Sequence, residues 1–94
     1  MIVVRNSFIA KPGCAGKLAR QFKDMAITAG IPSHRVMTDM TGDFNTVILE
    51  YEAENVTEFE ARMKDYMTNP VLQEKMKGYT ELWITGRREI YQIL

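Results

Sequence analysis

The sequence has little of what secreted, metal-binding or membrane proteins depend on. It has one cysteine, Cys14, so no disulfide can form within the chain. Small secreted domains commonly carry several disulfides, and we therefore expect a cytoplasmic protein. It also has one histidine, His34, and no Cys/His cluster with metal-ligand spacing, so we expect no metal site. No apolar run approaches the roughly 18 residues that suggest a membrane span, so no membrane association is expected.

An excess of charge of either sign is also missing. Twelve lysine and arginine residues balance twelve aspartate and glutamate residues, and the formal net charge is zero. Nucleic-acid-binding domains normally carry a basic surplus, whereas the longest basic run here is Arg87-Arg88, so we expect no nucleic-acid partner. What is present is ordinary globular composition, with 46% hydrophobic and 26% charged residues. We expect one domain over residues 1–94, large enough for one modest core.

The order of sequence periods predicts the fold. Alternating apolar and polar residues rich in β-branched side chains predict strands over 2–10, 34–41, 46–53 and 87–94. Apolar residues at helical spacing predict a first helix ending at Gly30 and a second over 56–67, followed by a short helical segment to about Gly78. Residues 79–86 fit neither period. The βαββαβ order predicts a ferredoxin-like α+β fold with a four-stranded antiparallel sheet.

Both faces of the expected strands carry apolar residues. The helices can cover only one face of the sheet, and a face left to solvent should be polar. The second set of apolar strand positions comprises Val3, Ile9, Ile48, Tyr91 and Ile93. Such a surface favours a second cover, and a two-fold interface needs only one self-complementary surface. We therefore expect a homodimer through the sheet faces, with the two sheets forming a barrel and the helices outside.

Several features of the chain carry a family resemblance. They are the βαββαβ order, Lys11-Pro12-Gly13 after the first strand, the Asn69-Pro70 break and the closing segment 86–91. Over essentially its whole length the chain resembles the dimeric α/β-barrel superfamily, which includes antibiotic-biosynthesis-monooxygenase-like and NIPSNAP-like proteins. The resemblance implies a dimeric barrel. It leaves the activity open, because members include cofactor-free monooxygenases acting on aromatic polyketides, heme-degrading enzymes, isomerases, dehydratases and proteins of unknown activity.

One site residue follows from this resemblance. Heme-degrading members use an asparagine on the first strand, and Asn6 lies at a matching place. They also use a tryptophan and a histidine on the second long helix, and residues 56–67 contain neither. The resemblance therefore does not extend to heme degradation, and we expect no cofactor.

Asn6 and His34 are the candidate catalytic residues. Asn6 falls on the helix-facing side of the first strand, where its amide could hold a ligand carbonyl or a peroxy intermediate, or could bond to neighbouring backbone. Histidine can transfer protons near neutral pH, although a residue at a strand entrance such as His34 is by default exposed. Cys14 precedes a helix but has no base near it in sequence, so we expect a small packing residue.

A set of large apolar residues could form a ligand-binding wall, or could simply be core. These are Phe8, Phe22, Tyr51, Phe59 and Met63. The sequence is compatible with a cofactor-free monooxygenase or isomerase acting on a small apolar or aromatic compound. It is equally compatible with a non-catalytic dimeric ligand-binding or protein-interaction module. For Arg5 and Arg88 we expect cross-strand pairing with Glu50 or Glu89.

Overall fold

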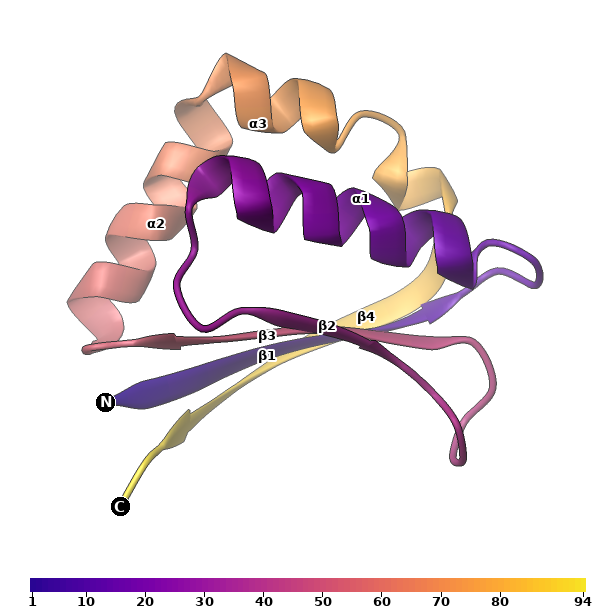
Figure 1. Cartoon of the computed structure of the whole chain (residues 1–94), viewed down its shortest axis with the longest axis horizontal. Helices are drawn as coiled ribbons and strands as arrows, with labels where there is room; N and C mark the ends of the chain where they lie inside the picture. Colours follow the sequence, from indigo (N-terminus) through magenta and orange to yellow (C-terminus); the bar gives the residue numbers. More distant parts are fainter.

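One antiparallel sheet with the strand order β2-β3-β1-β4 organises the molecule (Figure 1). The structure, a computed structural model, describes all residues 1–94. Its strands are β1 Ile2–Ala10, β2 Arg35–Thr38, β3 Thr46–Ala53 and β4 Trp83–Gln92. Its helices are α1 Ala15–Ala29, α2 Val56–Thr68 and α3 Pro70–Lys75, with a short 3-10 turn, η1, at Tyr79–Glu81. This arrangement confirms the predicted ferredoxin-like α+β fold.

All the helices lie on one side of the sheet, and the other face is uncovered (Figure 1). The helix α1 runs along the sheet, α2 stands at one end, and α3 packs beside α1. No helix is long and apolar enough to cross a membrane. The buried core therefore lies in the single layer between the sheet and the helices.

The strand β1 is central, because it pairs in antiparallel fashion with both β3 and β4. Its buried residues Ile2, Val4 and Asn6 alternate with half-buried ones, which places the buried set on the helix side. Across the sheet, Asn6 pairs with Leu49 of β3 and with Arg88 of β4. A polar amide thus sits in the middle of the covered face, as the alternation predicts.

The helix ends follow ordinary capping chemistry. The helix α1 stops at Gly30, as predicted, because this residue adopts the left-handed conformation with φ 65°. The side chain of Asn55 caps α2 by accepting a hydrogen bond from the backbone N–H of Glu58 at 2.9 Å. Asn69 ends α2 and also caps α3, accepting from the Val71 N–H at 3.0 Å, with Pro70 at the first helical position. The chain therefore changes direction between α2 and α3.

Two strand predictions need correction. The strand β2 covers only Arg35–Thr38, because Asp39 turns back and its carboxylate accepts a hydrogen bond from the Thr46 N–H at 2.9 Å. The strand β4 begins at Trp83 rather than at 87 and ends at Gln92. The pairing of β1 with β4 shifts register near its start, so Ile84 is left without a partner and the period of two is broken. This bulge and the 3-10 turn at Tyr79–Glu81 together explain why residues 79–86 fit neither period.

The uncovered face of the sheet is less apolar than the sequence suggests. Its centre holds a cluster in which Arg5 Nε and Arg35 Nε donate to the two oxygens of Glu50, each at 2.8 Å. Glu50 is only 3% exposed. The expected pairing of Arg5 is confirmed, whereas Arg88 points to the helix side and pairs with neither glutamate. Apolar residues on this face, such as Val3 and Ile48, are half-buried beside the cluster.

Gly86 is required by close packing. It pairs with Phe8, and a Cβ at this position would lie 2.6 Å from Cδ1 of the Phe8 ring. We predict that Gly86→Ala lowers the free energy of unfolding by about 1–3 kcal/mol, because Phe8 must shift. Gly16→Ala is the control, since its Cβ would meet only the Arg20 guanidinium at 3.6 Å. Urea unfolding of both variants measures the difference; equal stabilities would contradict the packing account.

Glu50 should make stability depend on pH. Burial raises the pKa of its carboxyl group, but the hydrogen bonds from Arg5 and Arg35 and their charges more than offset this, so the net pKa is lowered. A lowered pKa in the folded state stabilises the fold above the unfolded-state pKa of about 4.3, and this contribution is lost as pH falls through the folded-state value. Urea unfolding at neutral and acidic pH measures the free energy of unfolding of the wild type and of two variants. We expect Glu50→Gln to lack the loss of stability at acidic pH and Glu52→Gln, the control, to keep it. If the wild type and Glu50→Gln lost the same free energy of unfolding at acidic pH, the role of Glu50 would be contradicted.

Candidate functional site

A pocket of about 420 Å³ lies between the helix side of the sheet and the helices. Of its 18 lining residues, 13 are hydrophobic, which is typical of sites for small organic molecules. The strands β1, β3 and β4 supply one wall, and α1, α2 and α3 with the adjoining chain supply the other. The pocket is therefore built from segments that lie far apart in the sequence.

Aromatic side chains form the inner apolar wall. The Phe8 and Phe22 rings pack with centroids 5.1 Å apart, and Tyr79 lies against Phe22 at 6.1 Å. Four of the five residues expected to contact a ligand, namely Phe8, Phe22, Tyr51 and Met63, line the pocket. The fifth, Phe59, is buried but is not a lining residue.

Asn6 lies in the sheet-side wall and is 8% exposed. Arg88 Nε donates to Asn6 Oδ1 at 2.7 Å. Because a guanidinium has donors only, this bond fixes which end of the amide is the oxygen. The amide nitrogen Nδ2 makes no hydrogen bond to another group of the chain. Asn6 therefore presents a donor without a protein partner at the wall of the pocket.

Arg88 bridges the sheet and α2. It bonds to Asn6 on one side, and its guanidinium carbon lies 5.3 Å from the centre of the Phe59 ring on the other. Arg88 lines the pocket and is also exposed to solvent, so it stands at the mouth. Phe59 acts behind Arg88 as the aromatic surface that positions it, which differs from the ligand contact expected from the sequence.

A second arginine, Arg62 on α2, also lines the pocket. Its terminal nitrogen donates to Glu58 Oε1 at 2.8 Å, while its Nε is buried and has no hydrogen-bond partner. The other oxygen of Glu58 accepts from the Glu54 backbone N–H at 2.9 Å. Hydrogen bonds from Arg62 and from this N–H lower the pKa of Glu58. Glu58 is thus a charged partner of Arg62 and is poorly suited to accept a proton.

Two tyrosines of the pocket remain protonated at neutral pH. Burial raises the pKa of Tyr51, and the nearby charges of Arg88 and Arg62 offset this only in part. Burial and the neighbouring Tyr79 hydroxyl raise the pKa of Tyr66 to about 12. Both hydroxyls therefore keep the proton that a hydrogen-bond donor needs. Tyr51 lines the pocket together with Arg62 and Arg88.

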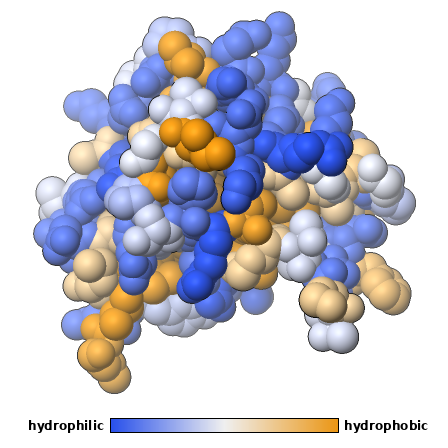
Figure 2. Space-filling view, in the orientation of Figure 1, coloured by the Kyte–Doolittle hydropathy of each residue, from blue (hydrophilic) through white to orange (hydrophobic).

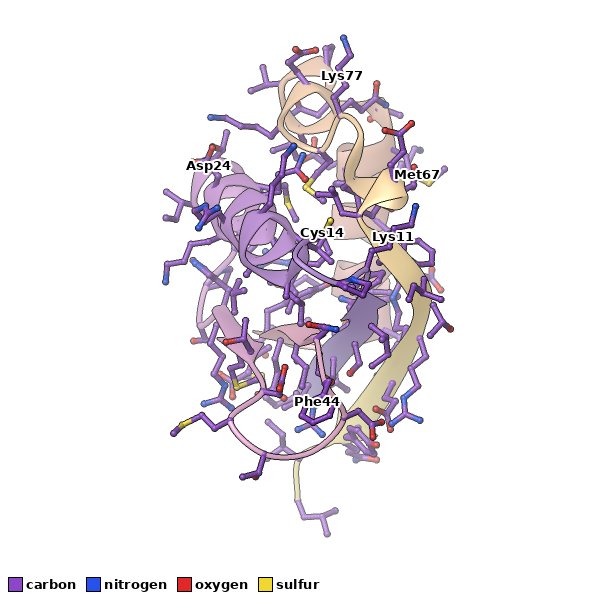
Figure 3. All side chains as sticks on the ribbon, turned by 90° about the vertical axis from the view of Figure 1, so that its right-hand side faces the viewer. Lys11, Cys14, Asp24, Phe44, Met67 and Lys77 are labelled. Atoms are coloured by element: carbon purple, nitrogen blue, oxygen red, sulfur yellow. The ribbon has the colours of Figure 1, made fainter.

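His34 and Cys14 lie outside the pocket lining. His34 Nδ1 is 2.6 Å from the Ile31 carbonyl oxygen at the entrance to β2, so His34 and Asn6 do not form one site. Cys14 sits at the start of α1 close to Lys11, where it is half-buried against the core (Figure 3). No group of three or more histidine, cysteine, aspartate and glutamate side chains is placed to hold a metal ion.

The two cationic residues of the pocket, Arg62 and Arg88, are not among the site residues expected from the sequence. The sequence predicts an ion pair for Arg88, yet the alternation along β4 already places this residue on the helix side. Ile90 pairs with Val4, so a residue two positions earlier shares the helix side with Asn6. Arg62 immediately precedes Met63 on α2, where it looks like an ordinary surface position.

Comparison with known proteins identifies the fold. No protein-family model and no curated protein matches the sequence. Among solved structures, an uncharacterized NIPSNAP domain protein from Burkholderia xenovorans is similar with a TM-score of 0.82 and 12% identity, over 100% of this chain and 95% of that one. A NIPSNAP family protein from Agrobacterium tumefaciens has a TM-score of 0.83 and 12% identity, over 97% and 90%.

A further neighbour carries an enzyme name. It is a candidate antibiotic biosynthesis monooxygenase from Chloroflexus aurantiacus, with a TM-score of 0.75 and 14% identity, over 99% of this chain and 92% of that one. At these identities the likeness concerns the fold. The chain therefore has the ferredoxin-like α+β fold shared by NIPSNAP proteins and antibiotic-biosynthesis-monooxygenase-like proteins, as its sequence resemblance implies.

Proposed function

We propose that this protein is a homodimer that binds a small, largely apolar or aromatic compound in the pocket between sheet and helices. The observation that carries the proposal is the Asn6 amide nitrogen, a donor without a protein partner in a mostly apolar wall. The buried side-chain atoms without a partner do not include Asn6 Nδ2, so this nitrogen is accessible from the pocket, where a ligand oxygen can accept its hydrogen bond. The volume of about 420 Å³ suits such a compound.

Catalysis without a cofactor, as a monooxygenase or an isomerase, extends this proposal. The oriented Asn6 amide would hold a carbonyl or peroxy oxygen of the substrate, and the aromatic wall of Phe8 and Phe22 would exclude water. The fold likeness to a protein named as a candidate antibiotic biosynthesis monooxygenase also supports it. His34 has no part in this proposal, because it does not line the pocket.

A non-catalytic ligand-binding module is the second candidate. It is favoured by the scarcity of proton acceptors in the pocket, where the carboxylate of Asp65 is exposed to solvent. Glu58 is held by Arg62 and a backbone N–H, and the pKa values of Tyr51 and Tyr66 are raised. In this reading Asn6 orients the ligand, and no bond is made or broken.

The role of Asn6 can be tested with a neutral aromatic amide. We predict that the wild type binds naphthamide, whose carbonyl oxygen accepts from Asn6 Nδ2. Asn6→Ala should weaken this binding about two- to tenfold, the usual effect of one neutral hydrogen bond. Ser7→Ala is the matched control, since Ser7 is the next residue of β1 and faces the other side of the sheet. Calorimetric titration measures the affinity for naphthamide. A wild type that binds no naphthamide would contradict the pocket proposal, and equal affinities of the wild type and Asn6→Ala would contradict the role of Asn6.

The uncovered sheet face is the proposed dimer surface. It carries three arginines and three glutamates, most of them paired within the chain, so two copies can meet by two-fold symmetry without an excess of like charge. These residues are Arg5, Arg35, Arg87, Glu50, Glu52 and Glu89. Apolar side chains add to the surface, and Figure 2 shows them projecting at the C-terminal end, where Ile93 is 42% exposed and Leu94 fully so.

A single charge on this face should break the dimer. Ile48 lies between Ser7 of β1 and Met37 of β2 in the sheet. We predict that Ile48→Lys converts the dimer to a monomer, because a buried unpaired ammonium is costly. The control is Ile27→Lys on α1, which is 60% exposed on the helical side and should leave the dimer intact. Light scattering after size-exclusion chromatography reports the mass; a monomeric wild type would refute the homodimer.

A further inference from the structure

We propose that the compound bound in this pocket carries a carboxylate group, which Arg88 binds at the mouth together with the Asn6 amide. This inference rests on the proposed function and specifies its ligand class. The apolar body of the ligand would lie inward, against the aromatic wall that includes Phe8 and Phe22.

The polar groups left without partners in the pocket are mainly donors. Asn6 Oδ1 is occupied by Arg88, and both oxygens of Glu58 are occupied by Arg62 and a backbone N–H. What remains includes Asn6 Nδ2 and the terminal nitrogens of Arg88, whereas the carboxylate of Asp65, which also has no partner, is exposed to solvent. A site with such an excess of donors is complementary to a ligand group that only accepts, and an ionised carboxylate is such a group.

The charge of Arg88 is not compensated within the chain. Three of the four arginines in the sheet, Arg5, Arg35 and Arg87, form ion pairs with glutamates. Arg88 instead contacts a neutral amide and an aromatic ring. Asp65 also lines the pocket, but it is exposed and forms no ion pair with either arginine of the site. Arg88 is therefore the cation in the sheet that lacks an anion.

The position of Arg88 is suited to hold an anion. Its Nε is held by Asn6 and its plane rests on Phe59, so the side chain is oriented before a ligand arrives. Its other nitrogens can donate to a carboxylate in the paired geometry that arginine favours. Because Arg88 stands at the mouth, the carboxylate can keep contact with water while the apolar body is buried.

Two probes of matched shape test the charge requirement. Calorimetry with naphthoate and its neutral analogue naphthamide compares a carboxylate with an amide on the same apolar body. We expect the wild type to bind naphthoate at least about tenfold more tightly, the effect of hydrogen bonds to a charged group. Arg88→Gln should remove this preference by weakening naphthoate binding much more than naphthamide binding, because only the carboxylate loses a charged partner. The control Arg87→Gln changes the next residue, on the opposite face, and should keep the preference.

The outcomes separate the two proposals. Equal binding of both probes by the wild type, or a preference that survives in Arg88→Gln, would overturn the carboxylate inference and leave apolar binding intact. Binding of neither probe would overturn both. A further measurement uses the wild type alone, so its result does not depend on whether a variant folds. Raising the salt concentration from about 0.01 M to about 1 M should weaken naphthoate binding several-fold and leave the affinity for naphthamide unchanged. Equal salt responses would also overturn the inference.

Discussion

The hydrogen bond from Arg88 to Asn6 is the interaction on which the site depends. It joins the central strand β1 to the edge strand β4 on the covered side of the sheet. All the other β1 residues on that side are apolar. The bond satisfies the buried amide oxygen, fixes the amide orientation and leaves the amide nitrogen without a partner. It also holds the arginine against Phe59, so one contact arranges both polar elements of the pocket mouth.

The two faces of the sheet use their charged residues in opposite ways. On the uncovered face, Glu50 pairs with both Arg5 and Arg35 within the chain, and the surface as a whole carries three arginines and three glutamates. On the covered face, Arg88 meets no carboxylate. A balanced face suits association with an identical copy, whereas an uncompensated cation beside an apolar pocket suits an anionic small molecule. The proposed dimer and the proposed ligand therefore follow from the same alternation along the strands.

Much of this arrangement can be predicted from the sequence, and the failures have physical causes. The alternation in β1 places Asn6 correctly, and the glycine at position 30 ends α1 where expected. Gly86 looks like a turn residue, and only its pairing with Phe8 reveals that it makes room for a ring. The bulge at Ile84 hides the start of β4, and the pairing of Arg88 with Asn6 across the sheet is seen only in the folded chain. Non-local pairing decides these features, and no local pattern records it.

The central claim is that the Asn6 amide nitrogen is the ligand donor of the pocket. Nuclear magnetic resonance can observe the side-chain amide protons of Asn6 directly during titration with naphthoate, with the Asn55 side chain, whose oxygen caps α2, as an internal reference. The account predicts that the Asn6 amide signals move with the saturation of binding, while those of Asn55 stay in place. Naphthoate binding that leaves the Asn6 signals unmoved would contradict it.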